Sequence, residues 1–226
     1  MGYMVEAAIT PKAAAKLLIT GEIDLSANWA LNSAKRVLDE LLLISIDDFL
    51  SIVDCNNYGD IADIKQIPQF GRIETVMCVP SFFVQKGEIC ADYPQLGFFL
   101  KKDINASLLA KTKFGENHGK AASILGIARC VDRRICPSAL SRAFCSFSTE
   151  QQRELIVRLF FRIPIIQILL KASTQSQING YAPMTQLKES TMRRRSQCLR
   201  AIFRTLEEYQ NQNLNARIAN IVWEDS

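Results

Sequence analysis

Apolar residues recur at helical spacing along most of this chain, with polar residues between them. In residues 10–53 they follow the i, i+3, i+4, i+7 order of an amphipathic helix. Thr10-Pro11 is a typical helix start, because threonine caps the first turn and proline needs no amide hydrogen there, and Gly21 is a typical end. The pattern predicts two or three short helices, whose apolar positions are Ala13, Ala14, Leu17, Leu18, Trp29, Ala30, Ala34, Val37, Leu38 and Leu41.

The middle of the chain departs from this pattern. Residues 72–84 are rich in β-forming side chains and predict one or two strands, with turn-forming residues on both sides. Helical spacing returns in residues 105–130, and we expect the two glycines in 114–120 to interrupt that helix. Residues 135–140 indicate a strand or turn that leads into a short helix.

The last third is again mostly helical. Ser148 or Thr149 is placed to cap a helix that runs to about residue 161, and Pro164 ends or kinks it before a second apolar run. Residues 173–181 form a polar linker, residues 184–189 a short helix, and residues 218–223 a final strand, where a winged helix would place part of its wing. The expected fold class is mainly α with small β elements, arranged as tandem winged-helix or helix-turn-helix units.

These elements divide the chain into four expected parts. They are an N-terminal helical unit (1–55) that could be a helix-turn-helix, a small β-containing connector (56–104), a middle winged-helix-like module (105–172) and a C-terminal winged-helix-like module (173–226). A chain of 226 residues is long enough for one large core or for two or three small ones.

Charge separates the two halves of the chain. Residues 1–110 hold 9 Lys/Arg and 14 Asp/Glu, a net charge of −5, whereas residues 111–226 hold 18 Lys/Arg and 9 Asp/Glu, a net charge of +9. This asymmetry indicates a polyanionic partner for the second half and a different role for the first. RNA or an anionic membrane would also suit a basic half.

The richest basic segment combines an apolar stripe with five arginines. Met192, Leu199 and Ile202 mark a buried face, and Ser190 or Thr191 is placed to cap the helix. A helix that presents arginines from its first turns suits the major groove, where a guanidinium binds phosphate or guanine through paired hydrogen bonds. The alternative is a solvated helical face. The candidate DNA-binding residues here are Lys188, Ser190, Thr191, Arg193, Arg194, Arg195, Gln197, Arg200 and Arg204.

A second basic group precedes this helix in the chain. Arg133, Arg134 and Arg142 would extend the DNA contact from the middle module, or else pair with acidic residues of the first half. Aromatic residues do not alternate with basic ones as they do in single-strand stacking platforms, so duplex DNA is the expected ligand.

Sequence motifs argue for recognition without catalysis. No predicted strand carries Glu-x-Lys or Asp-x-Lys for a nuclease metal, because the one such triplet, Asp63-Ile64-Lys65, falls in the loop-like stretch 54–70. The chain also has no GxxxxGK[ST] loop, no HExxH and no GxSxG. Seven cysteines with scattered spacing and no CxxC pair predict buried free thiols in a reducing compartment, and neither a metal nor another cofactor is expected. His118, the single histidine, is expected to be structural or to face phosphate.

Three segments of the second half resemble the tandem winged-helix DNA-recognition modules attached to type II restriction endonucleases and related defence proteins. They are the helix end at 121–127, the element at 138–142 with the later proline break at 162–165, and the Ser-Thr-x-Arg-Arg-Arg helix at 190–195. The resemblance implies site-recognising DNA binding in a restriction, defence or mobile-element system.

The leading hypothesis is therefore a non-enzymatic protein that binds double-stranded DNA. An adaptor that docks a nuclease, ATPase or transposase through its acidic half is the alternative, and a transcriptional regulator is a further one. Because no stretch reaches about 18 apolar residues and the N-terminus lacks a signal-peptide pattern, we expect no membrane partner and a cytoplasmic location. The DNA site, the oligomeric state and the partner's identity do not follow from the sequence.

Overall fold

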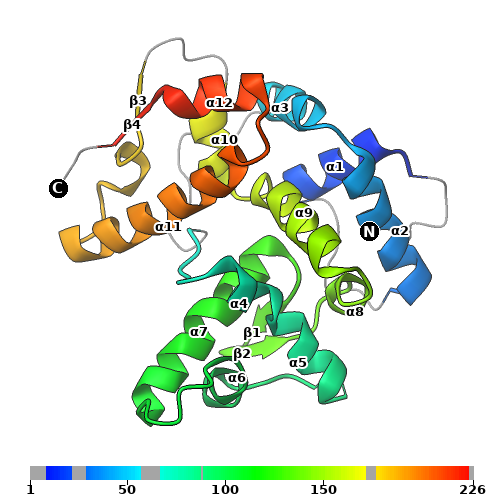
Figure 1. Ribbon diagram of the computed structural model, residues 1–226, viewed down its shortest axis with the longest axis vertical. Coiled ribbons are helices and arrows are strands. Elements are labelled where there is room, and N and C mark those ends of the chain that lie inside the picture. Colours follow the sequence, from blue (N-terminus) through cyan, green and yellow to red (C-terminus); the bar gives the residue numbers. More distant parts are fainter. Residues whose placement is uncertain (1–8, 22–28, 57–66, 88, 172–176, 224–226) are drawn as a thin grey trace.

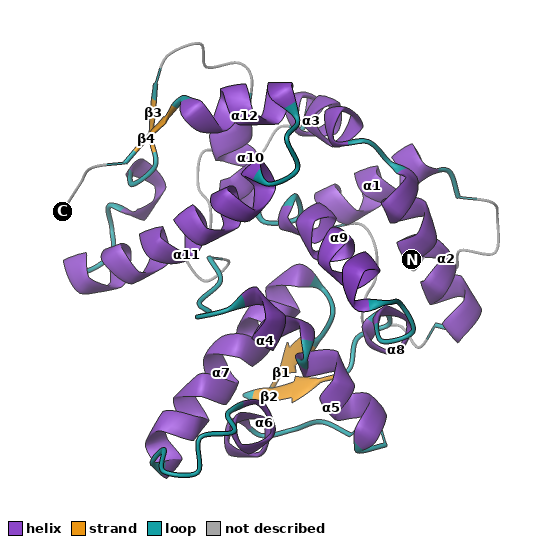
Figure 2. Cartoon of the chain, viewed as in Figure 1, coloured by secondary structure: helices purple, strands orange, loops and turns teal. Residues whose placement is uncertain are grey.

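The computed structural model describes residues 9–21, 29–56, 67–87, 89–171 and 177–223. Helices dominate these ranges and only short strands accompany them, which confirms the expected mainly α class with small β elements (Figure 2). None of the helices in these ranges combines the length and the apolarity that a membrane crossing requires.

The first helices, α1 (Pro11–Thr20), α2 (Leu31–Leu43) and α3 (Ile46–Cys55), lie within the predicted helical region. The predicted face differs at Ala13 of α1 and at Ala30 before α2, which are both exposed. The Thr10 hydroxyl accepts a hydrogen bond from the Ala13 amide, and Gly21 ends α1 in the left-handed conformation at φ 75°. The predicted apolar stripe of α2 is buried in the core. These ends and faces are set by local chemistry, which explains why the sequence predicted them.

The expected strands in residues 72–84 are a wrong prediction. The structure has two short helices there, α4 (Ile73–Met77) and α5 (Val79–Gln85). Apolar side chains fall at i, i+3, i+4 and i+7 and all four are buried, namely Val76, Val79, Pro80 and Phe83. Burial of one helical face therefore overrides the intrinsic β preference of these residues.

The expected break in residues 114–120 is also wrong, because α7 runs without interruption over Leu108–Leu125. Its glycines lie against α6 (Tyr93–Leu100). A Cβ built on Gly115 would lie 2.1 Å from the carbonyl oxygen of Tyr93, and one built on Gly97 of α6 would lie 1.9 Å from that of Lys111. The two helices pack backbone to backbone, which is what these glycines allow. This close helix pair spans the domain boundary predicted at residue 104.

A small sheet follows α7. Strands β1 (Arg129–Val131) and β2 (Arg134–Cys136) form an antiparallel hairpin, and both turn residues, Asp132 and Arg133, have positive φ. Ala91 pairs with Ile135 through two backbone hydrogen bonds of 2.7 and 2.8 Å, so it adds a third, one-residue strand.

The predicted free, buried thiols are corrected at this sheet. Cys90 and Cys136, next to the Ala91–Ile135 pair, form a disulfide, because antiparallel pairing places them opposite each other. Of the other five cysteines, Cys55, Cys78 and Cys130 are exposed. Spacing along the chain could not reveal a pairing that depends on this strand register.

Helices α8 (Ser141–Phe144), α9 (Thr149–Phe160) and α10 (Pro164–Leu170) connect the two sides of the molecule (Figure 1). Ser148 and Gln151 form the capping box of α9, and Pro164 opens α10, as the sequence predicted for a helix start and a break. The Phe161 ring after α9 stacks on Phe49 of α3 at 4.9 Å. The described residues thus share one continuous core.

The C-terminal part contains β3 (Ile178–Asn179), the 3-10 helix η2 (Ala182–Met184), α11 (Glu189–Glu207), α12 (Gln212–Ala219) and β4 (Ile221–Val222). β4 lies within the predicted final strand and pairs in parallel with β3. Arg217 of α12 binds both carboxylate oxygens of Asp54 at 2.7 and 2.8 Å, which ties this part to the end of α3.

Candidate nucleic-acid interface

The arginine helix forms as predicted on its buried side. Leu199, Ile202, Phe203 and Leu206 of α11 are in the core, and Met192 packs against it. The predicted cap is wrong, because Lys188 is the N-cap and Ser190 and Thr191 lie inside the first turn. The earlier start places Glu189 in that turn, where its negative charge interacts favourably with the positive end of the helix dipole.

The three consecutive arginines point in different directions, because successive residues on a helix are about 100° apart. Arg193 is exposed and pairs with Glu189 at 2.7 Å, and Arg194 is exposed and donates to the Ser190 carbonyl. Arg195 turns inward. With the Gln69 amide oriented to receive it, Arg195 Nε donates to the Gln69 oxygen at 2.9 Å, and burial lowers its pKa.

The later arginines of the helix also differ. Arg200 is half-buried, donates to the Tyr181 hydroxyl at 3.3 Å and lies 5.3 Å from the centre of the Trp223 ring. Arg204 is exposed two turns beyond Gln197. Of the predicted contact residues on or just before α11, those on the exposed side are Lys188, Ser190, Arg193, Arg194, Gln197 and Arg204.

Helix α7 lies beside α11 and contributes cations that the sequence interpretation missed. Gln69 links the two helices, because its amide nitrogen, in the same orientation, donates to Asn117 Oδ1 at 3.3 Å. The exposed face of α7 carries Lys113 and Lys120, which both bind Glu116 at 2.7 Å. Their helical spacing was the available signal, but the expected break at 114–120 hid it.

The β1–β2 hairpin adjoins the other side of α7 through Tyr93. The Lys120 ammonium lies 5.6 Å from the Tyr93 ring centre, and the Tyr93 hydroxyl is 3.8 Å from Cys130 Sγ in β1. Partial burial, then the Cys130 hydrogen bond, raise the pKa of Tyr93 to about 12, although the Arg133 charge opposes this rise. The hairpin turn with Arg133 is thus close to the lysine face of α7.

We name this surface the basic strip and define it by Arg133, Lys113, Lys120, Arg194 and Arg193. The five side chains are exposed and come from the hairpin, α7 and the first turns of α11. In Figure 1 both helices begin at the left and run toward the centre. Arginines near a helix N-terminus oppose the helix dipole by about 0.3–1 kcal/mol each. The i,i+4 pair of Arg193 with Glu189 returns only about 0.2–0.5 kcal/mol of this.

Two other predicted residues are placed differently from the strip. Arg134 is exposed in β2 and donates to the Cys90 carbonyl at 2.8 Å. Arg142 lies on α8, at the right of Figure 1, whereas α11 lies at the left. The structure therefore does not bring Arg142 together with the arginine helix. His118 is only 3% exposed, with Nδ1 2.8 Å from the Phe114 carbonyl oxygen, and burial lowers its pKa.

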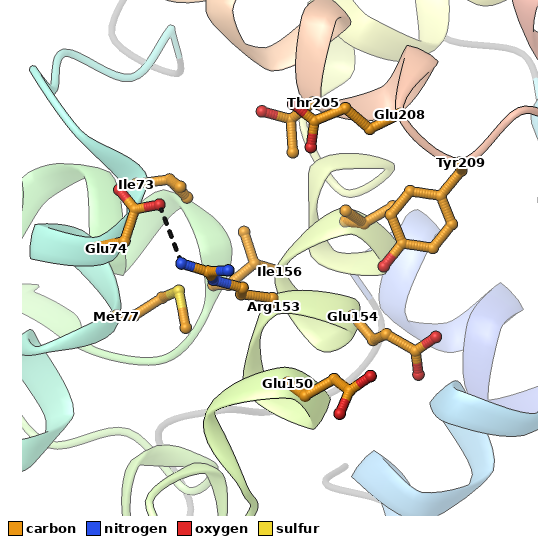
Figure 3. Close-up of a pocket in the computed structure, with 11 residues that line it drawn as sticks. Ile73, Glu74, Met77, Glu150, Arg153, Glu154, Ile156, Thr205, Glu208 and Tyr209 are labelled. Carbon is orange, nitrogen blue, oxygen red and sulfur yellow. Dashed lines mark ion pairs between the residues drawn. The ribbon is translucent and has the colours of Figure 1, made fainter.

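The far end of α11 has the opposite charge. We name the cavity there, of about 570 Å³, the glutamate pocket and define it by Glu74, Glu150, Glu154 and Glu208. Figure 3 shows these side chains around Arg153, which pairs with Glu74 at 3.7 Å. Four carboxylates around one guanidinium repel phosphate. The basic strip therefore ends within the length of α11.

In comparisons with known proteins, no family model, no curated protein and no solved structure matches the chain.

Proposed function

We propose that this protein binds double-stranded DNA without cutting it, and that the duplex lies on the basic strip. The observation that carries the proposal is that exposed cations lie on three linked elements, the consecutive α7 and hairpin and the much later α11. Tyr93 links α7 to the hairpin, and Gln69 links α7 to α11. Lysine and arginine gathered in this way neutralise successive phosphates and release their counterions. Glu189 in the first turn of α11 is paired with Arg193, and the carboxylates of the glutamate pocket lie at the other end of the helix, outside the strip.

The order of elements in residues 73–136 supports this role. After α4, helix α5 is followed by the Ala91 strand, then by α6, α7 and the hairpin, and Ala91 pairs with β2. Counted from α5, α7 is the third helix of this series. A winged helix has this order, with its third helix in the major groove and its hairpin beside the backbone. In that arrangement α7 reads the groove, Arg133 contacts flanking phosphates, and Arg193 and Arg194 extend the contact along the duplex.

We further propose that the protein recognises a site and works in a restriction, defence or mobile-element system. A transcriptional regulator would use the same surface, so the two contexts differ in the site that is selected. Selection of preferred sequences from a random duplex pool would reveal that site. If no sequence is enriched, the proposal of duplex binding would stand and the proposal of site recognition would be refuted.

The test is the binding of labelled duplex, single-stranded DNA and RNA by fluorescence anisotropy across a salt series. If four of the five strip cations contact phosphate, log K should fall with log salt at a slope of roughly −4. Replacing Arg193 and Arg194 by alanine should weaken duplex binding at physiological salt and make the slope shallower by about 2, because two phosphate contacts are lost.

The matched control is Arg36→Ala, which removes an exposed arginine from α2, at the opposite side of the molecule in Figure 1. Its salt slope should equal that of the unmodified protein. Unchanged affinity and slope after the Arg193 and Arg194 substitutions would overturn the proposed surface. Equal losses in the control and the test variant would indicate a non-specific effect of net charge.

An adaptor role is the second candidate, and the glutamate pocket is the observation that favours it. Its lining combines the four carboxylates with apolar residues that include Ile73, Met77 and Ile156. This combination suits a basic segment of a nuclease, ATPase or transposase. Glu150→Lys with Glu154→Lys should abolish co-purification with such a partner and preserve duplex binding. Retained co-purification would exclude the pocket as the docking point.

A further inference from the structure

A second cavity, of about 440 Å³, lies between the two helices of the proposed interface. Segment 69–71, α7 and α11 form its walls. Its volume falls within the roughly 300–1,000 Å³ range of ligand-binding pockets. It adjoins the basic strip, because Arg194 belongs to both.

The lining of this cavity differs from that of the glutamate pocket. No carboxylate lines it, and its polar groups are the amides of Gln69, Asn117 and Gln197, the guanidinium of Arg194, the imidazole of His118 and the thiol of Cys198. Phe70 and Phe114 supply apolar surface, and the Phe114 ring is held by His118, with ring centres 4.0 Å apart. The site therefore combines neutral hydrogen-bonding groups, aromatic surface and one cation.

This combination matches a nucleobase that carries a phosphate. A side-chain amide offers one donor and one acceptor, which complement the N6 and N7 edge of adenine. Aromatic side chains and guanidinium planes pack against unstacked bases, and arginine binds phosphate. The Gln69 hydrogen bond uses only the Asn117 oxygen, so it leaves the Asn117 amide nitrogen to face a ligand.

We propose that this cavity binds a purine base outside a stacked helix, with Asn117 and Gln197 on the edge of the base and Arg194 on its phosphate. The inference rests on the proposed function, because bound DNA is one source of such a base. An unpaired or displaced base of the duplex and a free nucleotide offer the same chemistry. Extruding a base from a duplex costs a few kcal/mol, least where it is already unpaired, which suggests a bulged duplex as the probe.

The experiment compares three probes: a fully paired duplex, the same duplex with one unpaired adenine, and AMP. The unpaired adenine should strengthen binding by about tenfold, the effect of one good base contact. Asn117→Leu removes the amide, and Ala201→Leu fills the cavity from α11, a change that suits a helix. Each variant should reduce the preference for the bulged duplex to below about twofold. Ala201→Leu, which keeps the Gln69–Asn117 hydrogen bond, should also leave paired-duplex affinity unchanged.

The control is Ala216→Leu, the same substitution at an exposed position of α12, which should keep the full preference. If the protein binds AMP, Asn117→Leu abolishes this binding, and both duplexes bind equally well, the result would support base binding in the cavity and assign it to free nucleotides. Paired-duplex binding without a bulge preference and without AMP binding would overturn the inference alone. If the unmodified protein binds neither duplex, the proposed function would be overturned, and the AMP measurement would still test base binding in the cavity.

Discussion

Replacing Gly115 by alanine tests the helix pairing that positions the interface. The new Cβ would lie 2.1 Å from the Tyr93 carbonyl oxygen and 2.6 Å from the Gly97 nitrogen, although real Cβ contacts are essentially never below 3.0 Å. The obstructing atoms are backbone, so no side chain can rotate away, and α6 must withdraw from α7 by roughly 1 Å.

The magnitude follows from two opposing effects. Alanine in a helix interior is favoured over glycine by about 1 kcal/mol. Overpacking of a close backbone contact costs about 1–3 kcal/mol, and a clash with two backbone groups indicates the upper end. The net loss should be about 2 kcal/mol, which lowers the Tm of a chain of this size by roughly 4–8 °C.

Thermal unfolding followed by circular dichroism measures this loss, with urea unfolding as a second assay. Gly71→Ala is the control, because a Cβ there meets nothing within 4 Å and the backbone is not left-handed. That variant should be unchanged or more stable by up to about 1 kcal/mol. If Gly115→Ala is as stable as the original protein, the close packing of α6 on α7 is wrong and the residue only lowers helix propensity.

Three further predictions concern titration, redox state and the extent of the interface. Because the pKa of Tyr93 rises to about 12 on folding, its contribution to stability is full below pH 10 and is lost as the pH rises toward 12. Tyr93→Phe should therefore flatten the alkaline part of the curve of unfolding free energy against pH. An identical curve for the variant would contradict this. Reducing the Cys90–Cys136 disulfide should lower the free energy of unfolding by about 2–4 kcal/mol. Dithiothreitol should therefore lower the Tm of the original protein and leave the Tm of Cys90→Ser unchanged. A Tm of the original protein that does not respond to reductant would argue against the bond. Arg142→Ala should change duplex affinity by less than about twofold, whereas a loss equal to that of Arg193→Ala would extend the interface to α8.

The reasons for correct and wrong predictions are visible in particular residues. Helix ends such as Thr10, Gly21 and Pro164 were predictable, because a cap or a proline acts on its own neighbours. The helices α4 and α5 were not, because their valines and phenylalanines prefer strands until a core covers one helical face. The glycines of α7 were read as a break, since a chain without its partner helix cannot show a backbone contact.

The candidate interface divides in the same way. The arginine helix and its buried stripe followed from periodicity, but a linear pattern treats Arg193, Arg194 and Arg195 alike. The fold turns Arg195 toward Gln69 and Arg200 toward Tyr181, and it moves Arg142 away. It also brings Lys120 beside the hairpin.

The sequence by itself determined which segments are helical for local reasons and which half is basic, because caps, periodicity and charge act over a few residues. Only the tertiary structure decided which cations share a surface, which cysteines pair, and where the amide-lined and glutamate-lined cavities form. Those outcomes depend on contacts between residues far apart in the chain, such as Ala91 with Ile135 and Gln69 with Asn117. Their geometry exists only once the helices have packed.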